Sequence, residues 1–80
     1  MNFTGTIQQN PSAQNIKDVI DASQNSGLCA IYELGTQNTT QAQTESRRQE
    51  LIQAGIPAAQ VKNYAGWISA PHFSIYNGSC

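Results

Sequence analysis

Apolar residues are concentrated in one stretch of the chain, Leu28–Leu34, where Glu33 is the only charged side chain. A run this short and rich in strand-forming residues is typical of a β-strand covered on both faces, so we expect the central strand of a sheet here. Gly35 and a polar loop, Thr36–Thr39, follow it, and then comes the densest charge cluster of the chain, residues 45–50. We expect any functional site at the passage from this strand to the following helix.

Before the central strand, the pattern predicts one strand and one helix. Apolar and polar residues alternate over residues 3–8, which is the period of a strand with one buried face. Asn10 and Pro11 are typical of a helix start, because Asn accepts a hydrogen bond from a free helix N–H and Pro fits the first helical position. Gly27 is the expected end of this helix. Its residues at helical spacing are Ala13, Ile16, Val19 and Ile20, with Lys17 and Asp21 four apart on the polar side.

A second helix is predicted from Thr39 or Thr40 to Gly55, just before Pro57. Thr40 and Gln43 have the spacing of a capping box. Its expected buried side is narrow and consists of Ala42, Leu51, Ile52 and Ala54. The rest is covered by charged side chains, which form either a solvated face of little energetic value or part of a binding site: Glu45, Arg47, Arg48 and Glu50.

The C-terminal part is predicted to form two strands, Val61–Ile68 and Phe73–Tyr76, joined across residues 69–71. The predicted order is therefore β-α-β-α-β-β in a single domain, residues 1–80. This order is typical of an α+β two-layer sandwich, ferredoxin-like or permuted, with two helices on one face of a four-stranded sheet.

Such a sheet leaves one face without helices. Phe73 and Ile75 are expected on the covered face. The open face is expected to carry hydroxyl, imidazole and phenol groups, some of them from Thr4, Thr6, His72, Ser74 and Tyr76. This face is a usable binding surface, and it is also what any small two-layer domain leaves uncovered.

Charge and composition narrow the classes of function. The chain has a formal net charge of -1, and 11% of its residues are charged. A nucleic-acid binder needs clustered Lys and Arg, which the four basic residues of this chain do not provide. No run reaches the roughly 20 apolar residues of a membrane span, and residues 1–5 lack the basic and apolar segments of a signal peptide. We therefore expect a cytoplasmic protein that contacts neither nucleic acid nor membrane.

Two cysteines are present, Cys29 in the predicted central strand and Cys80 at the last position. Two are too few for a disulfide framework or a metal cluster. We expect Cys29 to be a small buried apolar residue and Cys80 a terminal thiol, and a bridge between them is the less favoured alternative.

Groups that carry chemistry are sparse. The sequence has no Gly-rich phosphate loop, no metal-ligand spacing, and no Ser or Cys nucleophile with a base, since His72 is the only histidine. We therefore expect no metal and no cofactor. Glu33 either anchors a ligand amine or turns outward or pairs with an arginine of the second helix. The candidate binding residues are Tyr32, Glu33, Glu45, Arg47, Arg48, Trp67, His72 and Tyr76.

Three short motifs follow one another between Leu28 and Ile75: Ser46-Arg47, Gly66-Trp67, and Pro71 with Phe73. Their succession resembles the core of the phage S-adenosylmethionine lyases, an antirestriction family, and of their uncharacterised bacterial relatives. In that family an Asn-x-x-Arg helix follows the first core strand, then come a Gly-aromatic pair and a strand of the type Glu-Pro-Ser-Phe.

Two positions depart from the family's pattern. Thr44 stands where the family has Asn, and Ala70 stands where it has the acidic residue expected to hold the ligand. The family's trailing helix and strand are absent, although the strand at residues 3–8 and the helix after Asn10 could fill the same places, as in a circular permutation. The resemblance implies a domain of the same layout that has lost lyase activity.

Three functions from different classes remain. We favour a non-enzymatic protein of phage or mobile-element type that binds and inhibits a host protein, such as a CRISPR or restriction defence complex, through roughly 800 Å² per partner. The second is a ligand-binding protein or enzyme of the S-adenosylmethionine lyase type, with Tyr32, Glu33 and Arg47 in its site. The third is a structural subunit that completes its core as a homo-oligomer, suggested by Trp67 and Tyr76, which are expected to be exposed.

Overall fold

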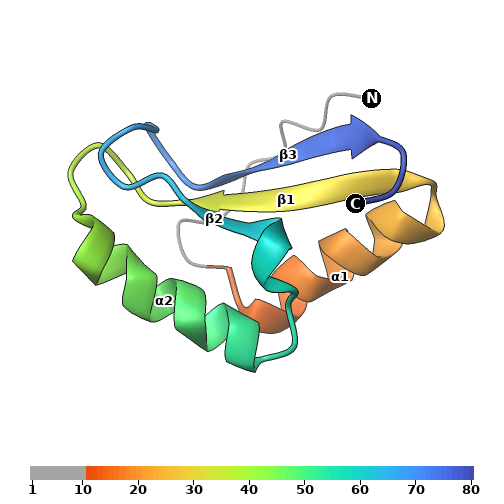
Figure 1. The fold of residues 1–80 in the computed structure, drawn as a ribbon, viewed down its shortest axis with the longest axis horizontal. Coiled ribbons are helices and arrows are strands. Elements are labelled where there is room, and N and C mark those ends of the chain that lie inside the picture. The colour runs from red at the N-terminus through yellow and green to blue at the C-terminus, as the bar shows by residue number, and fades with distance from the viewer. Residues whose placement is uncertain (1–10) are drawn as a thin grey trace.

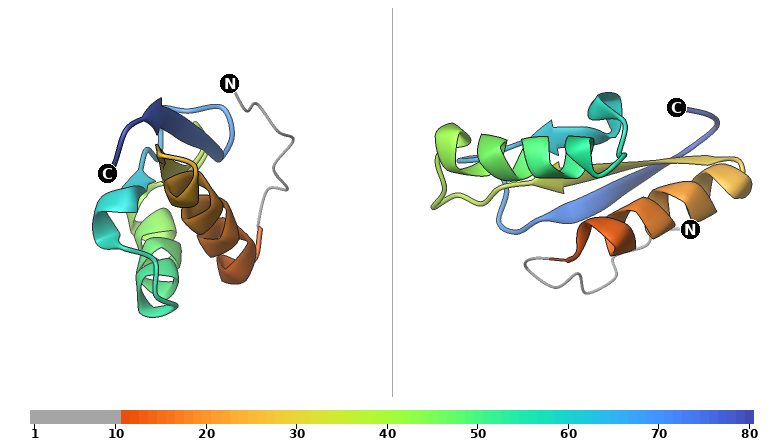
Figure 2. Two further views of the ribbon diagram at one scale, coloured as in Figure 1. Left: turned by 90° about the vertical axis from the view of Figure 1, so that its right-hand side faces the viewer. Right: turned by 90° about the horizontal axis from the view of Figure 1, so that it is seen from below.

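The structure is a computed structural model that describes residues 11–80. Two helices, α1 (Ala13–Asn25) and α2 (Gln41–Gln53), pack on one face of a mixed sheet, as Figures 1 and 2 show. The strands are β1 (Leu28–Leu34), β2 (Val61–Asn63) and β3 (His72–Asn77), and a single 3-10 turn, η1 (Ala58–Gln60), precedes β2. The α+β class predicted from the sequence is confirmed.

Strand β1 is the centre of the sheet, whose order is β2-β1-β3. It runs parallel to β2, with Tyr32 opposite Val61, and antiparallel to β3, with Tyr32 opposite Phe73. The central strand at Leu28–Leu34 is therefore confirmed. Among residues 11–80, the helices lie on one of its faces (Figure 2), and Ile31 and Glu33 are half-buried on the other, so full cover of both faces is not seen in this part of the chain.

Four strands are not seen. The sheet has three strands within residues 11–80, and the strand predicted at residues 3–8, with Thr4 and Thr6, lies outside the described residues. The C-terminal strand is confirmed and extends one residue further at each end than predicted.

The strand predicted over Val61–Ile68 is too long, because β2 ends at Asn63. The Asn63 side-chain oxygen accepts a hydrogen bond from the Ala65 N–H at 3.1 Å, which bends the chain away from the sheet. A turn closed by Trp67 N–H to the Tyr64 carbonyl at 2.9 Å follows directly. Local side-chain bonding to the backbone thus competes with strand pairing in a segment whose apolar content favours a strand.

Helix α1 starts two residues later than Asn10 and Pro11 predict. Ser12 is its N-cap and accepts a hydrogen bond from the Asn15 N–H at 3.1 Å. Ser, like Asn, is a preferred N-cap, so the two neighbouring signals compete and the later one prevails. The predicted Lys17–Asp21 pair is confirmed, with 2.7 Å between the charged atoms.

Helix α2 begins with the predicted capping box of Thr40 and Gln43. Its buried side is narrower than predicted, because Ala42 and Ala54 are exposed and Leu51 alone is fully buried within the helix. Arg48 is also on the side of α2 that contacts the rest of the fold. Its guanidinium donates to the carbonyls of Val61 at 2.9 Å and Ala58 at 3.2 Å, so part of the predicted charged face fastens the helix to the sheet.

Between the layers lies an apolar core to which both α-helices and all three strands of residues 11–80 contribute. The Tyr32 and Phe73 rings pack there with 5.2 Å between their centroids. The buried members are Ile16, Ile20, Ala30, Tyr32, Leu34, Leu51, Ile56, Val61 and Phe73.

Cys29 and Cys80 form a disulfide, with their Cα atoms 4.9 Å apart. The less favoured alternative, a bridge between them, is therefore the one seen. Cys29 is buried as expected, but the expectation that Cys80 is a terminal thiol is wrong. The reason lies in the topology: β3 runs antiparallel to β1 and pairs Asn77 with Leu28, which returns the C-terminus to the start of β1. A hydrogen bond from the Gly78 N–H to the Gly27 carbonyl at 2.9 Å also holds the C-terminal residues beside the start of β1.

Candidate functional site

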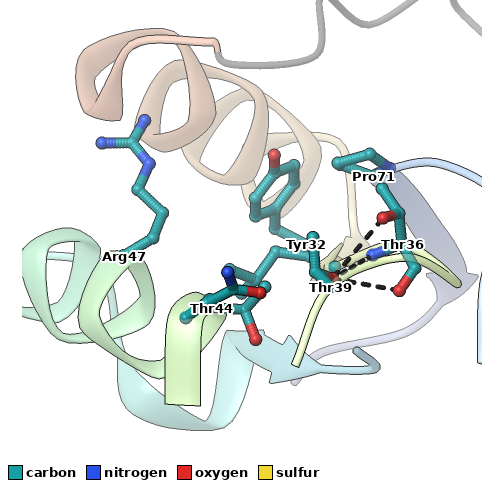
Figure 3. A pocket seen from close by; sticks show the side chains of 9 residues that line it. Tyr32, Thr36, Thr39, Thr44, Arg47 and Pro71 are labelled. Carbon is teal, nitrogen blue, oxygen red and sulfur yellow. Dashed lines mark hydrogen bonds between the residues drawn. The ribbon is translucent and has the colours of Figure 1, made fainter. Parts of the chain in front are cut away.

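A cavity of about 350 Å³ lies at the carboxyl end of β1, where the chain turns toward α2. It is formed between the strand, the loop after it and the first turns of α2, and Figure 3 shows it from close by. The residues that line it are Tyr32, Leu34, Gly35, Thr36, Thr39, Gln43, Thr44, Arg47 and Pro71.

The loop side of the cavity is braced by two threonines. The Thr36 N–H donates to the Thr39 hydroxyl at 2.8 Å, and that hydroxyl donates to the Thr36 carbonyl at 3.0 Å, as the dashed lines in Figure 3 mark. Gly35 is held against the loop after β2, since a Cβ atom there would lie 2.6 Å from the Ala65 nitrogen. This side of the cavity is therefore rigid backbone that only glycine permits at position 35.

The helix side is fixed by Asn63 at the end of β2. The Thr44 hydroxyl donates to the side-chain oxygen of Asn63 at 2.6 Å, and the side-chain amide of Asn63 donates to the Gln41 carbonyl at 3.2 Å. Sequence reasoning missed Asn63, although a polar residue just after a short apolar strand is the kind of signal that marks such a connection.

Tyr32 and Arg47 are the two candidate residues that the structure brings together. Tyr32 is only 3% exposed, and its burial raises the pKa of the phenol, an effect that the positive charge of Arg47 partly opposes. The phenol therefore stays neutral at physiological pH and can donate a hydrogen bond. In Figure 3 the Tyr32 and Arg47 side chains extend in the same direction, toward α1, with open space between them.

Arg47 is held in place from two sides. One terminal nitrogen of its guanidinium donates to the Pro11 carbonyl at 2.6 Å, just before α1, and the other pairs with Glu50 at 3.1 Å. Its side chain is one-third exposed. The guanidinium is thus positioned at the edge of the cavity by a backbone anchor and a solvated partner.

Glu33 and His72 form a separate pair on the helix-free face of the sheet. The Glu33 carboxylate lies 2.7 Å from the His72 Nε2 atom, and the two residues are register neighbours of β1 and β3. The other ring nitrogen of His72 lies 2.9 Å from the Ala70 carbonyl. Glu33 thus lies on the sheet face away from the helices, but its side chain is only 15% exposed and pairs with His72, a partner that the sequence analysis did not propose, and not with an arginine of α2.

Glu45 and Arg48 form an ion pair of 3.2 Å on α2, away from the cavity lining. A hydrogen bond from the Gln49 amide is the main cause that lowers the pKa of the Glu45 carboxyl, and the Arg48 charge adds to it. Since Arg48 also binds two backbone carbonyls, this pair stabilises the fold, and neither residue lines the cavity.

Trp67 and Tyr76 are exposed by 79% and 53% of their surface, but they do not share a patch. Trp67 lies in the loop between β2 and β3, whereas Tyr76 lies near the far end of β3, opposite Cys29. The eight residues proposed from the sequence therefore fall into several separate places.

No protein family, no curated protein and no solved structure matches this chain. The resemblance to the S-adenosylmethionine lyases accordingly stays a hypothesis. Within residues 11–80, no helix combines the length and apolar content needed to cross a membrane. The same residues contain no cluster of three or more His, Cys, Asp or Glu side chains suited to a metal ion.

Proposed function

We propose that this domain is a non-enzymatic binding protein whose ligand is a small molecule held in the cavity at the carboxyl end of β1. The convergence of Tyr32 and Arg47 on that cavity carries the proposal. Its volume lies within the range of about 300–1,000 Å³ that is usual for ligand pockets. In open parallel sheets, ligands bind beyond the carboxyl ends of the strands, and this cavity lies at the carboxyl end of β1, which pairs in parallel with β2.

Binding without catalysis is supported by the lining itself. None of its nine residues is Asp, Glu, His, Lys or Cys. Arg47 keeps its proton, and the raised pKa of Tyr32 keeps the phenol neutral, so neither exchanges a proton near neutral pH. An S-adenosylmethionine-type ligand remains the alternative, with Tyr32 and Arg47 in the site but Glu33 on the opposite face of the sheet.

The direct test is a screen of small metabolites by ligand-observed NMR against the wild-type protein and a Pro71→Trp variant. Pro71 is a half-buried lining residue, so a larger ring there fills the cavity without replacing a hydrogen-bonded side chain. The proposal predicts ligands that bind the wild type and lose binding to the variant. Ligands that bind both proteins equally would place the site elsewhere.

A second candidate is inhibition of a host protein by contact, as expected of a phage or mobile-element protein that blocks a CRISPR or restriction complex. The observation that favours it is the 79% exposure of Trp67, because Trp is enriched among residues that dominate protein interfaces. This candidate predicts a host complex, identified by mass spectrometry, that co-purifies with the wild type and the Arg47→Gln variant but not with Trp67→Ala. Light scattering of the same samples tests the remaining alternative, a homo-oligomer.

The cytoplasmic location stays a proposal, and the Cys29–Cys80 disulfide argues against it. Disulfides persist in oxidising compartments, whereas cytosolic thiols are kept reduced. Alkylation of free thiols in the source cells, followed by mass spectrometry, separates the two locations. Two alkylated cysteines support the cytoplasm, and a protected pair supports an oxidising compartment.

A further inference from the structure

We infer that the cavity takes an organic monoanion, a carboxylate on a small apolar body, held by Arg47 and Tyr32. The inference rests on the proposed function and names the class of ligand for the same site. Three observations carry it: the charge of the lining, the hydrogen-bond donors that remain free, and the apolar surface beside them.

The charge of the cavity is a single positive one. Arg47 is the one charged residue among the nine that line it. Two of its five N–H donors are used by Pro11 and Glu50. The Glu50 side chain is 65% exposed, and such a solvated pair contributes little, so a ligand carboxylate can replace Glu50 as the partner of Arg47.

Most of the hydroxyl groups around the cavity are already used by the protein. Thr39 donates to the Thr36 carbonyl, and Thr44 donates to Asn63. In contrast, Figure 3 shows no hydrogen bond between the Tyr32 hydroxyl and the other residues that line the cavity. The neutral phenol, the guanidinium and the side-chain N–H groups of Gln43, whose amide oxygen accepts from the Thr40 N–H, are therefore the side-chain donors available to an anionic oxygen.

The remaining lining is apolar and fits an apolar body next to the carboxylate. The Leu34 side chain, the Pro71 ring and the Tyr32 ring provide it, and Gly35 adds no side chain. A single arginine balances one negative charge. A phosphate dianion would leave one charge without a partner in a partly buried site, so the chemistry favours a carboxylate over a phosphate.

Isothermal titration calorimetry with benzoate, benzamide and inorganic phosphate tests the assignment. Benzoate is expected to bind the wild type, and its uncharged isostere benzamide and inorganic phosphate to bind at least about 10-fold more weakly. Arg47→Gln is expected to weaken benzoate by about 10-fold or more, and Tyr32→Phe by about 5-fold. Lys62→Gln removes an exposed charge of β2 outside the cavity and is expected to leave the affinity unchanged.

The Glu50→Gln variant tests whether Arg47 binds the ligand directly or only supports the fold. Because it removes the carboxylate that competes for Arg47, benzoate is expected to bind about 2- to 5-fold more tightly, an effect that a structural role of Arg47 does not produce. Equal binding of benzamide and benzoate, with no effect of Arg47→Gln, would overturn the anion assignment but leave the cavity as the binding site. Absence of binding by all three probes would overturn the assignment, and the proposed function falls only if the metabolite screen is negative as well.

Discussion

Arg47 and Tyr32 reach the same cavity from different layers of the domain, Arg47 from helix α2 and Tyr32 from the central strand. The Tyr32 ring also packs on Phe73 in the core, with 5.2 Å between the ring centroids. The side chain that offers a hydroxyl to the cavity is thus held by the core itself. A donor fixed in this way is the kind of preorganised group that a binding site needs.

The burial of Tyr32 predicts a loss of stability in alkali. Its pKa is raised in the folded protein, so above a pH of about 10 the unfolded chain releases the phenol proton while the folded one retains it. The folded state then binds more protons, and the free energy of unfolding falls as the pH rises. Urea unfolding between pH 8 and 11 should show a steeper fall for the wild type than for Tyr32→Phe. Lys17 titrates in both proteins and cancels in the difference, and identical profiles would show that Tyr32 is not shielded from water.

The Cys29–Cys80 disulfide predicts a large effect of reduction on stability. The bond joins residues 51 positions apart, so it restricts the unfolded chain, and a double Cys29→Ser, Cys80→Ser variant should lose about 2–4 kcal/mol of unfolding free energy. Denaturant unfolding with and without dithiothreitol measures this loss of unfolding free energy. The reductant should destabilise the wild type by the same amount and leave the variant unchanged. A wild type insensitive to reductant would contradict the role of the bond.

Substitutions of Gly35 and Gly66 can be compared to test the loop beside the cavity. Both have positive φ, 116° and 86°, but a Cβ at Gly35 would meet the Ala65 backbone at 2.6 Å, whereas one at Gly66 meets nothing within 4 Å. Gly66→Ala should cost about 1–2 kcal/mol for backbone conformation alone. Gly35→Ala should cost clearly more because the two loops must also separate. Thermal unfolding of the two variants gives the comparison, and equal losses would mean that the loops are not in contact.

Arg48 is expected to matter for stability even though it is a charged residue on a helix surface. Its guanidinium binds the carbonyls of Val61 and Ala58, so Arg48→Leu should lower the free energy of unfolding by about 2 kcal/mol. Lys17→Ala, which breaks the exposed pair with Asp21, should change it by less than about 0.5 kcal/mol. Urea denaturation of both variants measures the contrast. Similar values would show that Arg48 is only part of a solvated face.

The elements that the sequence predicts well are those with a local physical cause. The apolar run gives β1, the Thr40–Gln43 pair gives the start of α2, and the alternation around Phe73 gives β3. Each signal acts within a few residues and needs no knowledge of the remaining chain. The strand predicted over Val61–Ile68 is too long because a second local effect opposes the apolar pattern. The side chain of Asn63 bonds to the backbone two residues later and ends β2 there.

The site depends on contacts between distant residues, which local patterns do not contain. The sequence directs attention to Tyr32 and Arg47, but the separation of Glu33 from the cavity follows from the alternation of β1 and its register with His72. Likewise, the disulfide depends on the antiparallel return of β3 to Cys29. These are properties of the topology, so they become visible only when the strands are paired.

The most direct test of the account is a titration of the ¹⁵N-labelled protein with benzoate, followed by amide chemical shifts. If the cavity at the carboxyl end of β1 is the binding site, the shifts should concentrate at its lining, at Gly35, Thr36, Thr39, Thr44 and Arg47. In Arg47→Gln the same shifts should need about 10-fold more benzoate or more. Shifts confined to the His72–Asn77 strand or to the loop around Trp67 would contradict it.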